Sequence, residues 1–275
     1  SKSVIIASTP LYHTLAQRLV ILSILLGGTL VIMSGFSNKK WFSEVKRNKV
    51  TFAMLVSSQL ENLINFKNNS FKNAYSLKSI VASSSKLHEK IRVKISRYKK
   101  PHFYEIYGTS EIAAVTNLKL TKNSKKIYSV GKPIKNTSVK IINNKNIFLK
   151  KGNIGEIVCK TPLIFSGYLN KKKETRLSFC KNYFKTGDMG YLDKDNYLYY
   201  TSRKKNIIIV GGINVYPEDI ERILKKNNQV RDCSVFGIIS KTLGEQIVVA
   251  IVKNKKELDE RRLRKYSLKN LADYQ

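Results

Sequence analysis

Strand-like and helix-like segments alternate through the first hundred residues, and this alternation constrains the fold more than any other feature of the chain. Short apolar runs predict strands, and longer runs with helical periodicity predict helices. The predicted strands are Val4–Ala7, Thr29–Met33, Phe52–Val56 and Ser79–Ala82. The predicted helices are Leu15–Leu26, Trp41–Asn48, Ser58–Phe66 and Lys86–Tyr98. This pattern is typical of an α/β fold with a mainly parallel sheet layer.

Two further changes of pattern divide the rest of the chain. Residues 117–201 hold short strands between Gly, Asn, Asp and Lys turns, which predict a small β-rich, barrel-like subdomain. Its predicted strands are Val139–Ile142, Ile147–Leu149, Gly155–Cys159 and Tyr197–Tyr200. Residues 202–275 mix strand and helix patterns and predict a partial, small α+β C-terminal domain. We therefore expect a partial N-terminal domain over residues 1–201, with its α/β layer at residues 1–116.

The chain is strongly basic: 51 Lys and Arg stand against 19 Asp and Glu, for a net charge of +32. Such a charge suggests nucleic acid or an anionic membrane surface as a partner. The Lys clusters are spread along the chain, however, and Lys greatly outnumbers Arg. We therefore expect a solvated basic surface and no specific nucleic-acid partner, and we leave a peripheral membrane contact open.

Two other classes of structure are not supported. The apolar stretch Leu19–Met33 is interrupted by Gly27 and Gly28 and is shorter than a membrane-spanning helix. A buried helix to Leu26, a glycine turn and a buried strand from Thr29 explain it better. Three cysteines and three histidines, all far apart, predict neither a zinc site nor a disulfide framework. Free cysteines favour a reducing compartment, so we expect a cytoplasmic protein.

The stretch YEIYGTSEIAAV, Tyr104–Val115, places a carboxylate where a basic chain has little structural need for one. Glu111 follows a predicted strand, a glycine and two hydroxyl residues. Ligands of parallel sheets bind in the loops at the carboxyl ends of the strands. Taken alone, the stretch also fits a strand-end turn with a capping Ser and a surface Glu.

Several segments, in chain order, resemble motifs of the acyl-adenylate-forming superfamily, which includes acyl-CoA synthetases, peptide-synthetase adenylation domains and luciferases. The segments are PLYHT (Pro10–Thr14), YGTSE (Tyr107–Glu111), VGKPI (Val130–Ile134), GEI (Gly155–Ile157), GYL (Gly167–Leu169), YFKTGDMGYLD (Tyr183–Asp193) and SRKKNIIIVGGINVYPEDIE (Ser202–Glu221). Each segment alone is a weak signal, but their common order is specific. The resemblance implies an ATP-dependent carboxylate–CoA ligase that forms an acyl-adenylate, releases pyrophosphate and passes the acyl group to the thiol of coenzyme A.

The resemblance implies nucleotide and metal contacts for the YGTSE segment. Tyr107 would offer its ring to adenine, and Gly108 would allow a close approach of the backbone. Thr109 would also contact the nucleotide. Ser110, which replaces the family's Thr, would donate its hydroxyl to the α-phosphate. Glu111 would ligate Mg²⁺, a cation that prefers carboxylate and phosphate oxygens.

Five residues in other parts of the chain stand at positions of further contacts in the family. Asp188 resembles the acceptor of hydrogen bonds from the ribose hydroxyls, and Arg203 resembles a second nucleotide contact. Ser84 and Ser85 stand where the family has a Gly-rich adenine loop, which is a departure from its pattern. His13 resembles a residue that lines the acyl pocket, although a lone His here equally fits a packed or capping residue.

The resemblance also implies a moving C-terminal domain. Lys205 would be the hinge about which this domain swings between adenylation and thioester formation. Gly211 and Gly212 resemble the loop that meets the pantetheine arm of CoA, and a plain β-turn is the alternative for this pair.

Two parts of the family pattern are not found in these 275 residues: the Gly-rich phosphate loop and the C-terminal loop with a catalytic lysine. We therefore expect this exact chain to adenylate poorly or not at all, while the complete protein is a ligase for a fatty or aryl acid. Two alternatives stay open. One is an adenylating enzyme that loads a carrier-protein thiol. The other is an inactive remnant or a basic module that binds polyanions.

Overall fold

The computed structural model describes residues 3–66, 71, 74–122, 125–210, 213–240, 244–254 and 259–272. The chain divides into two compact units, which are described separately. Unit 1 comprises Ser1–Lys140, Val158–Phe184 and Leu192–Tyr199. Unit 2 comprises Ile141–Ile157, Lys185–Tyr191 and Tyr200–Gln275.

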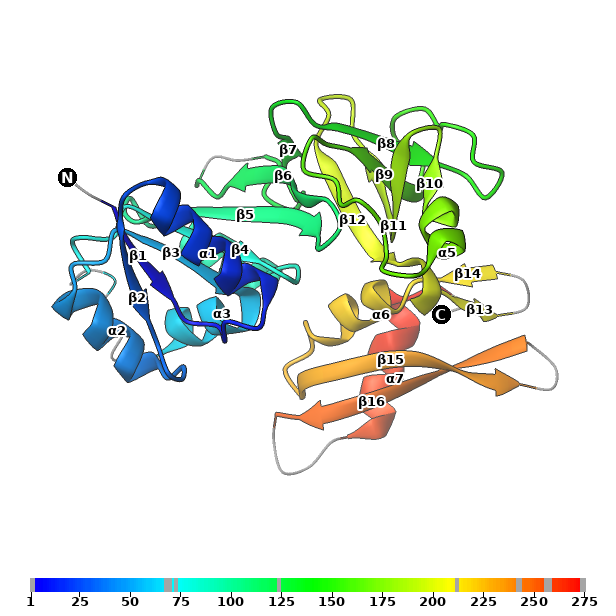
Figure 1. Cartoon of the computed structure of the whole chain (residues 1–275). Helices are drawn as coiled ribbons and strands as arrows, with labels where there is room; N and C mark the ends of the chain where they lie inside the picture. Colours follow the sequence, from blue (N-terminus) through cyan, green and yellow to red (C-terminus); the bar gives the residue numbers. More distant parts are fainter. Residues whose placement is uncertain are drawn as a thin grey trace. The chain divides into compact units, whose positions relative to one another are not determined.

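Unit 1 is built on a seven-stranded sheet with the strand order β2-β1-β3-β4-β5-β6-β7 (Figure 1). The strands are β1 (Val4–Ala7), β2 (Thr29–Ile32), β3 (Phe52–Val56), β4 (Ser79–Ser83), β5 (His102–Thr109), β6 (Ala113–Lys119) and β7 (Lys132–Pro133). The first five strands in chain order pair in parallel, and β6 and β7 are added antiparallel. The predicted α/β fold with a mainly parallel sheet is therefore confirmed. The division predicted between residues 116 and 117 falls within β6.

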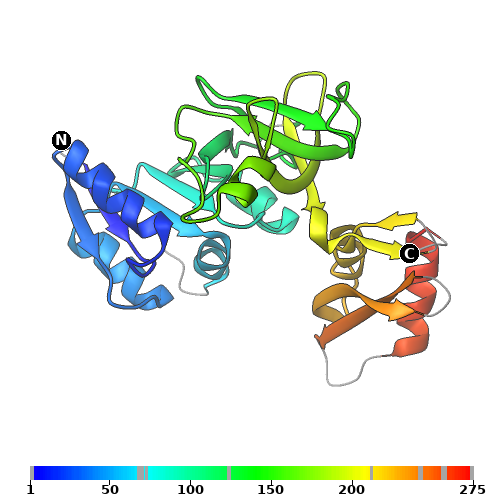
Figure 2. The same cartoon turned by 45° about the vertical axis from the view of Figure 1, so that its right-hand side comes forward.

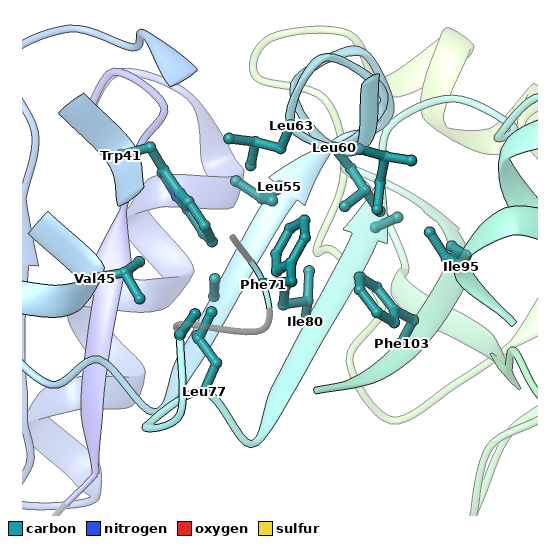
Figure 3. Close-up of a cluster of buried hydrophobic side chains, with 14 of the residues drawn as sticks. Trp41, Val45, Leu55, Leu60, Leu63, Phe71, Leu77, Ile80, Ile95 and Phe103 are labelled. Carbon is teal, nitrogen blue, oxygen red and sulfur yellow. The ribbon is translucent and has the colours of Figure 1, made fainter. Parts of the chain in front are cut away.

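Four helices cover this sheet: α1 (Thr14–Leu25), α2 (Asn38–Arg47), α3 (Ser57–Asn65) and α4 (Glu89–Ile95). Side chains of α2, α3 and α4 share one buried cluster with one face of the strands (Figure 3). In that close-up, Trp41 of α2 and Leu60 of α3 point toward the same cluster as Ile80 of β4. Helix α1 packs on the opposite face, against Ile5 and Met54. Because side chains alternate between the two faces along each strand, the sheet packs against helices on both faces.

The ends of α2 show how local sequence fixes a helix in this layer. The hydroxyl of Ser37 at the N-cap accepts a hydrogen bond from the Lys40 backbone N–H, and basic residues occupy the last turn. Between these ends, Trp41 and Val45 are fully buried in the core. Burying a large apolar side chain stabilises a fold by about 1.5–3 kcal/mol, so packing outweighs the caps.

A second sheet has five strands, in the order β10-β11-β9-β8 with β12 paired to β11. Its strands are β8 (Ser138–Ile142), β9 (Gly155–Lys160), β10 (Phe179–Cys180), β11 (Tyr183–Leu192) and β12 (Leu198–Arg203), and the short helix α5 is Lys172–Leu177. The predicted strand Ile147–Leu149 is wrong, because only an isolated bridge joins Phe148 to Ile142. Asn143 explains the difference, since its carboxamide oxygen accepts hydrogen bonds from the backbone N–H groups of Lys145 and Ile147 and closes a tight turn.

The C-terminal part of unit 2 is a four-stranded antiparallel sheet with the order β14-β13-β16-β15. Its strands are β13 (Ile208–Val210), β14 (Ile213–Val215), β15 (Val230–Ser240) and β16 (Gly244–Lys253). The 3₁₀ helix η2 (Lys204–Asn206) precedes them, and the helices are α6 (Pro217–Leu224) and α7 (Glu260–Asn270). Ile220 and Leu224 of α6 and Leu263 of α7 share one buried cluster with the strands. Figure 2 shows the backbone of this part, with α7 in red beside the orange strands. This α+β arrangement agrees with the sequence prediction.

The apolar stretch Leu19–Met33 forms the second half of α1, a glycine turn and β2, as predicted, but the predicted burial is wrong for much of it. Leu25 of α1 is 78% exposed, and Ile32 is 55% exposed because β2 is the edge strand of the sheet. Among the described residues, none of the helices combines the length and the hydrophobicity needed to cross a membrane. All three cysteines are free and buried. Burial raises the pKa of the Cys233 thiol to about 11, so this thiol stays protonated near neutral pH.

Candidate nucleotide-binding site

The first group of candidate residues lies in unit 1, at the carboxyl ends of neighbouring parallel strands (Figure 1). Strand β1 leads to His13, and β3 leads directly to Ser57 at the start of α3. Strand β4 leads to Ser84 and Ser85, and β5 carries the segment Tyr107–Glu111. Because β1, β3, β4 and β5 are adjacent and parallel, these loops share one edge of the sheet, where ligands of α/β folds bind.

Gly108 lies within β5, where the sequence had suggested a turn after the strand. A Cβ atom at this position would lie 1.8 Å from the carbonyl oxygen of Ala113 on β6. The β5–β6 pairing shifts register at this point, and Ala113 has a positive φ of 57°. The structure therefore shows a second reason for glycine at position 108: the backbone of β6 at Ala113 comes too close to leave room for a side chain.

Glu111 is held by the GYL segment of the same unit. Its carboxylate oxygen Oε1 accepts a hydrogen bond of 3.0 Å from the Tyr168 hydroxyl, and its carbonyl oxygen accepts one of 2.7 Å from the Phe165 backbone N–H. The Phe165 and Tyr168 rings pack edge to face, with centroids 4.8 Å apart. Burial raises the pKa of Tyr168, and the Glu111 carboxylate adds to the rise. Tyr168 thus orients the candidate metal ligand.

Sequence reasoning had used the GYL segment as a family landmark and gave Tyr168 no role. The signal that could have found it is chemical. A tyrosine in a recognised motif has a hydroxyl that must find a partner when it is partly buried. A conspicuous carboxylate such as Glu111 is one candidate for that partner. The pairing across 57 positions is a tertiary contact that local patterns do not contain.

Thr109 and Ser110 present hydroxyl groups at the end of β5. The Thr109 oxygen Oγ1 is buried, and among the described residues it has no hydrogen-bond partner. Ser110 is exposed in the turn that follows. A buried hydroxyl without a partner is uncommon in a folded protein and is a candidate contact for a bound polar group. These two positions fit a nucleotide phosphate beside Glu111.

The residues present also fit a magnesium ion that is shared with a nucleotide. Among the described residues, no group of three or more His, Cys, Asp and Glu could hold a metal ion by itself. Mg²⁺ in nucleotide sites is commonly bound by one or two carboxylates together with phosphate oxygens and waters. Glu111, as a single carboxylate beside hydroxyl groups, matches that donor set.

Ser84 and Ser85 form an exposed loop after β4. Ser84 has a positive φ of 80°, a conformation that glycine adopts most readily, so the loop keeps a glycine-like backbone despite its serine sequence. The buried Ser57 hydroxyl donates to the carbonyl oxygen of Ser85 and lies 3.4 Å from the carbonyl oxygen of Ser83. The departure from a Gly-rich loop is therefore compatible with the same turn of the chain.

His13 is exposed at the N-cap of α1, and its side chain makes no capping hydrogen bond. Its ring lies against Tyr12, with ring centroids 4.6 Å apart. The backbone N–H of His13 donates to the Pro10 carbonyl oxygen at 3.0 Å. The structure thus offers no packed or side-chain capping role for this residue, and its part in an acyl pocket stays a prediction.

The second group of candidate residues lies in unit 2. Asp188 sits in the middle of β11 after Gly187, whose φ is +69°, and its side chain is buried. The Arg203 Nε atom at the end of β12 lies 2.9 Å from Asp188 Oδ1. The Asp188 backbone N–H donates to the Thr186 hydroxyl at 3.1 Å, which fixes the strand locally. The structure therefore brings together the two residues predicted to contact the ribose side of a nucleotide.

Two neighbours of this pair were not singled out from the sequence. Burial raises the pKa of Tyr200, and the Glu218 and Asp188 carboxylates add to the rise. Burial also raises the pKa of Glu218, although a hydrogen bond with the Arg203 backbone opposes it. Tyr200 and Glu218 thus lie near the Asp188–Arg203 pair. The sequence signal was the position of Glu218 in the first turn of a predicted helix, which is typical of many helices.

Lys205, the predicted hinge, is exposed in η2, and its neighbour Lys204 makes a 2.7 Å ion pair with Glu156 of the GEI segment. The chain is therefore held firmly up to the residue before the predicted hinge. Gly211 and Gly212, predicted to meet the pantetheine arm, lie outside the described residues.

Comparison with known proteins identifies the family and the fold of the chain. The family model described as AMP-binding enzyme matches residues 1–169. The chain is 27% identical to 2-succinylbenzoate–CoA ligase from Oceanobacillus iheyensis over 96% of its own length and 54% of the relative. It is 29% identical to indoleacetate–CoA ligase from Aromatoleum aromaticum over 82% of its own length and 44% of the relative. The chain thus spans about half the length of the curated relatives it matches.

Solved structures show the same likeness in three dimensions. The o-succinylbenzoate CoA synthetase from Bacillus subtilis, in complex with its acyl-adenylate intermediate, matches with a TM-score of 0.89 and 26% identity, over 99% of this chain and 55% of that protein. An amide bond synthetase from Marinactinospora thermotolerans matches with a TM-score of 0.90 and 25% identity, over 99% of this chain and 56% of that protein. From its sequence segments, its fold and these matches, the chain belongs to the AMP-binding enzyme family of adenylate-forming proteins.

Proposed function

We propose that the complete protein is an ATP-dependent ligase that joins a carboxylic acid to coenzyme A through an acyl-adenylate. The observation that carries the proposal is the buried Asp188 carboxylate, which is held from one side by the half-exposed Arg203. Buried carboxylates are expensive unless they are paired, and a partner that reaches solvent can be exchanged for a ligand. A ribose, with two adjacent hydroxyl donors, suits such a carboxylate.

The residues at the carboxyl edge of the unit 1 sheet supply the phosphate side of the reaction. Ser110 and the buried Thr109 hydroxyl would donate hydrogen bonds to phosphate oxygens, and Glu111, oriented by Tyr168, would hold Mg²⁺. The ion, when bound, offsets the negative charge that accumulates as a carboxylate attacks the α-phosphate. Tyr107 and the loop at Ser84 and Ser85 would bind the base of the nucleotide.

The nature of the acid follows from the relatives and stays part of the proposal. Two of the matched relatives are named for aryl acids, 2-succinylbenzoate and indoleacetate, and another is named a medium/long-chain-fatty-acid–CoA ligase. We therefore place an aryl acid ahead of a long-chain fatty acid as the substrate, with His13 at the acyl side. CoA is the proposed acceptor because the curated relatives are named as CoA ligases.

The proposal is tested first by nucleotide binding to the 275-residue chain. Isothermal titration with AMP should give saturable binding for the wild type and much weaker binding for Asp188→Asn. The full-length protein purified from its source cell should then form acyl-CoA from ATP, CoA and an aryl acid. Absence of AMP binding by the chain, together with absence of acyl-CoA formation by the full-length protein, would overturn the proposal.

The same experiments separate the alternatives. Release of pyrophosphate without acyl-CoA formation, but with acylation of a carrier-protein thiol, would favour the carrier-loading enzyme. The net charge of +32 keeps the polyanion-binding module as a competing explanation. A steep fall in RNA affinity with rising salt, with no AMP binding, would favour that module, because its binding would rest on counterion release.

A further inference from the structure

A buried ion pair in unit 1 lies outside the residues assigned above. Arg92 of α4 and Glu105 of β5 form it, and their side chains are 0% and 2% exposed. Arg92 Nη2 donates to Glu105 Oε1. Burying two charges is favourable only when good geometry and further hydrogen bonds offset the loss of water. The remaining contacts of this pair therefore indicate what it holds in place.

Arg92 also donates three hydrogen bonds to backbone carbonyl oxygens. Nε donates to the Leu87 carbonyl oxygen at 3.2 Å, and Nη1 donates to the carbonyl oxygens of Ile127 and Ser129, each at 2.7 Å. The fixed planar fork of a guanidinium can hold several acceptors in set directions, which a lysine cannot do. One side chain thus ties the loop after β4 to the segment before β7.

Glu105 holds the same loop from the other side. Its Oε1 atom accepts a 3.2 Å hydrogen bond from the Leu87 backbone N–H, so both backbone groups of Leu87 are bound by the ion pair. Glu105 is also two residues before Tyr107 on β5. The pair therefore connects the loop from Ser84 to Leu87 with the strand that carries the proposed nucleotide contacts.

The loop has a second fixed point at its other end. Ser57, at the start of α3, donates its hydroxyl to the carbonyl oxygen of Ser85, and a longer contact of 3.4 Å joins it to the carbonyl oxygen of Ser83. The exposed residues Ser84 and Ser85, which are the proposed contacts to the base, lie at this end of the loop. Serine adopts a positive φ less readily than glycine does, so anchors at both ends of the loop help to hold Ser84 at its φ of 80°.

Stability alone is a poor explanation for this pair. Well-packed apolar residues often replace a buried ion pair without loss of stability. In addition, Glu105 Oε2 is buried, and among the described residues it has no hydrogen-bond partner. Burial raises the pKa of Glu105, and the Arg92 guanidinium opposes that rise. A costly ion pair at this position is better explained by a role in fixing the geometry of the groups that it binds.

We propose that the Arg92–Glu105 ion pair positions the loop Ser83–Leu87 against β5, so that the base side of the nucleotide site is formed before a nucleotide binds. This inference rests on the function proposed above. Preformed binding loops improve affinity because less ordering is needed on binding. Arg92 and Glu105 are positioning residues, since no nucleotide contact is assigned to either of them.

The test uses the double variant Arg92→Met/Glu105→Met, which removes both charges at similar volume. Its melting temperature, its AMP and UMP affinities and its backbone hydrogen exchange are compared with those of the wild type. Val45→Ala, on the buried face of α2, is the control for general destabilisation. Glu105→Gln is the conservative variant, because its amide oxygen can still accept from Leu87 and Arg92.

We expect the double variant to lose about tenfold in its preference for AMP over UMP, with faster exchange at Leu87. Val45→Ala should leave the preference and the Leu87 exchange unchanged, and Glu105→Gln should keep most of the preference. A folded double variant with wild-type selectivity and wild-type exchange at Leu87 would overturn the inference. If the wild type binds no AMP, the nucleotide-binding proposal fails for this chain. The exchange at Leu87 then decides the positioning role by itself.

Discussion

Two arginine–carboxylate pairs, one in each unit of the molecule, differ in how they are held. Glu105 and Asp188 are both buried, with side chains 2% and 3% exposed. Their partners are not alike: Arg92 is 0% exposed, whereas Arg203 is 49% exposed. Arg92 also binds three backbone carbonyl groups, and Arg203 adds only a long 3.5 Å contact to the Thr186 carbonyl oxygen.

The difference indicates that the Arg92–Glu105 ion pair is permanent, whereas the Asp188–Arg203 ion pair can be exchanged for contacts with a ligand. Water cannot replace Arg92, because its side chain is fully buried and donates to four fixed acceptors, Glu105 Oε1 and three backbone carbonyl oxygens. Arg203 is accessible, so a ligand hydroxyl can take its place beside Asp188 at small cost. We therefore infer that the first pair shapes the protein and that the second pair is available to a nucleotide.

The largest expected effect is on stability and comes from breaking the enclosed pair. Arg92→Met leaves Glu105 buried without its cation, which should cost about 3–5 kcal/mol in the free energy of unfolding. Arg203→Met should cost less, because Arg203 is half exposed and water can reach the side of Asp188 that it leaves. Urea unfolding of both variants measures the contrast. Equal losses for the two variants would contradict the distinction drawn between the pairs.

The next largest effect is on AMP binding, for which we expect Asp188 of the accessible pair to matter more than the enclosed pair. Asp188→Asn keeps the shape of the side chain and removes its charge. Hydrogen bonds to a charged acceptor contribute about 1.5–3 kcal/mol, so AMP should bind about 10- to 100-fold more weakly. Calorimetric titration with AMP checks this, and the unfolding curve of the variant provides the control. An unchanged affinity would remove Asp188 from the proposed site.

The sequence indicated Asp188 and Arg203 because both lie in recognisable segments, but it gave no hint of Arg92. Arg92 is one basic residue among 51 Lys and Arg, and only the tertiary structure shows it enclosed. The same pair explains an error in the prediction of α4. That helix was expected from Lys86 but begins at Glu89, because side chains of Arg92 and Glu105 bind the backbone of Leu87.

Other parts of the fold were predictable because their signals are local. Strands β1 and β3 have the predicted bounds, since each is a short apolar run ended by polar or turn residues. The contact of Tyr168 with Glu111 and the hold of Ser57 on the loop after β4 join residues far apart in sequence. Such contacts depend on which strands are neighbours, and local periodicity does not determine this.

A third ion pair, of intermediate exposure, sharpens the comparison through its pH dependence. Lys126 Nζ lies 2.6 Å from Asp193 Oδ2 and 2.8 Å from Asp195 Oδ2. Burial opposes the ionisation of Asp193, but Lys126 and backbone N–H groups outweigh it and lower its pKa. Hydrogen bonding to Lys126 lowers the pKa of Asp195, and the two carboxylates raise the pKa of Lys126.

The sign of the effect follows from these shifts. Lowered carboxylate pKa values stabilise the fold above their ordinary value of 3.8, and this stability is lost as the pH falls through the folded values. The raised pKa of Lys126 stabilises the fold below 10.5, and this is lost as the pH rises through the folded value. Lys126→Met should therefore lower the melting temperature at pH 7, by less than Arg92→Met does, and should have little effect near pH 2. A pH-independent loss would contradict the electrostatic origin.

The smallest expected effect tests the backbone of the loop that Arg92 and Ser57 hold. Ser84 has a φ of 80°, where a residue other than glycine is strained by about 1–2 kcal/mol. Ser84→Gly relieves this strain, but glycine loses about 0.5–1 kcal/mol more conformational entropy on folding. The free energy of unfolding should therefore rise by about 0–1.5 kcal/mol. Ser85→Gly is the matched control, because Ser85 is not among the described residues with positive φ, and it should be destabilising. If both substitutions destabilise the chain equally in urea unfolding, the loop does not hold Ser84 in a strained conformation, and the anchors at Ser57 and Leu87 do not impose its shape.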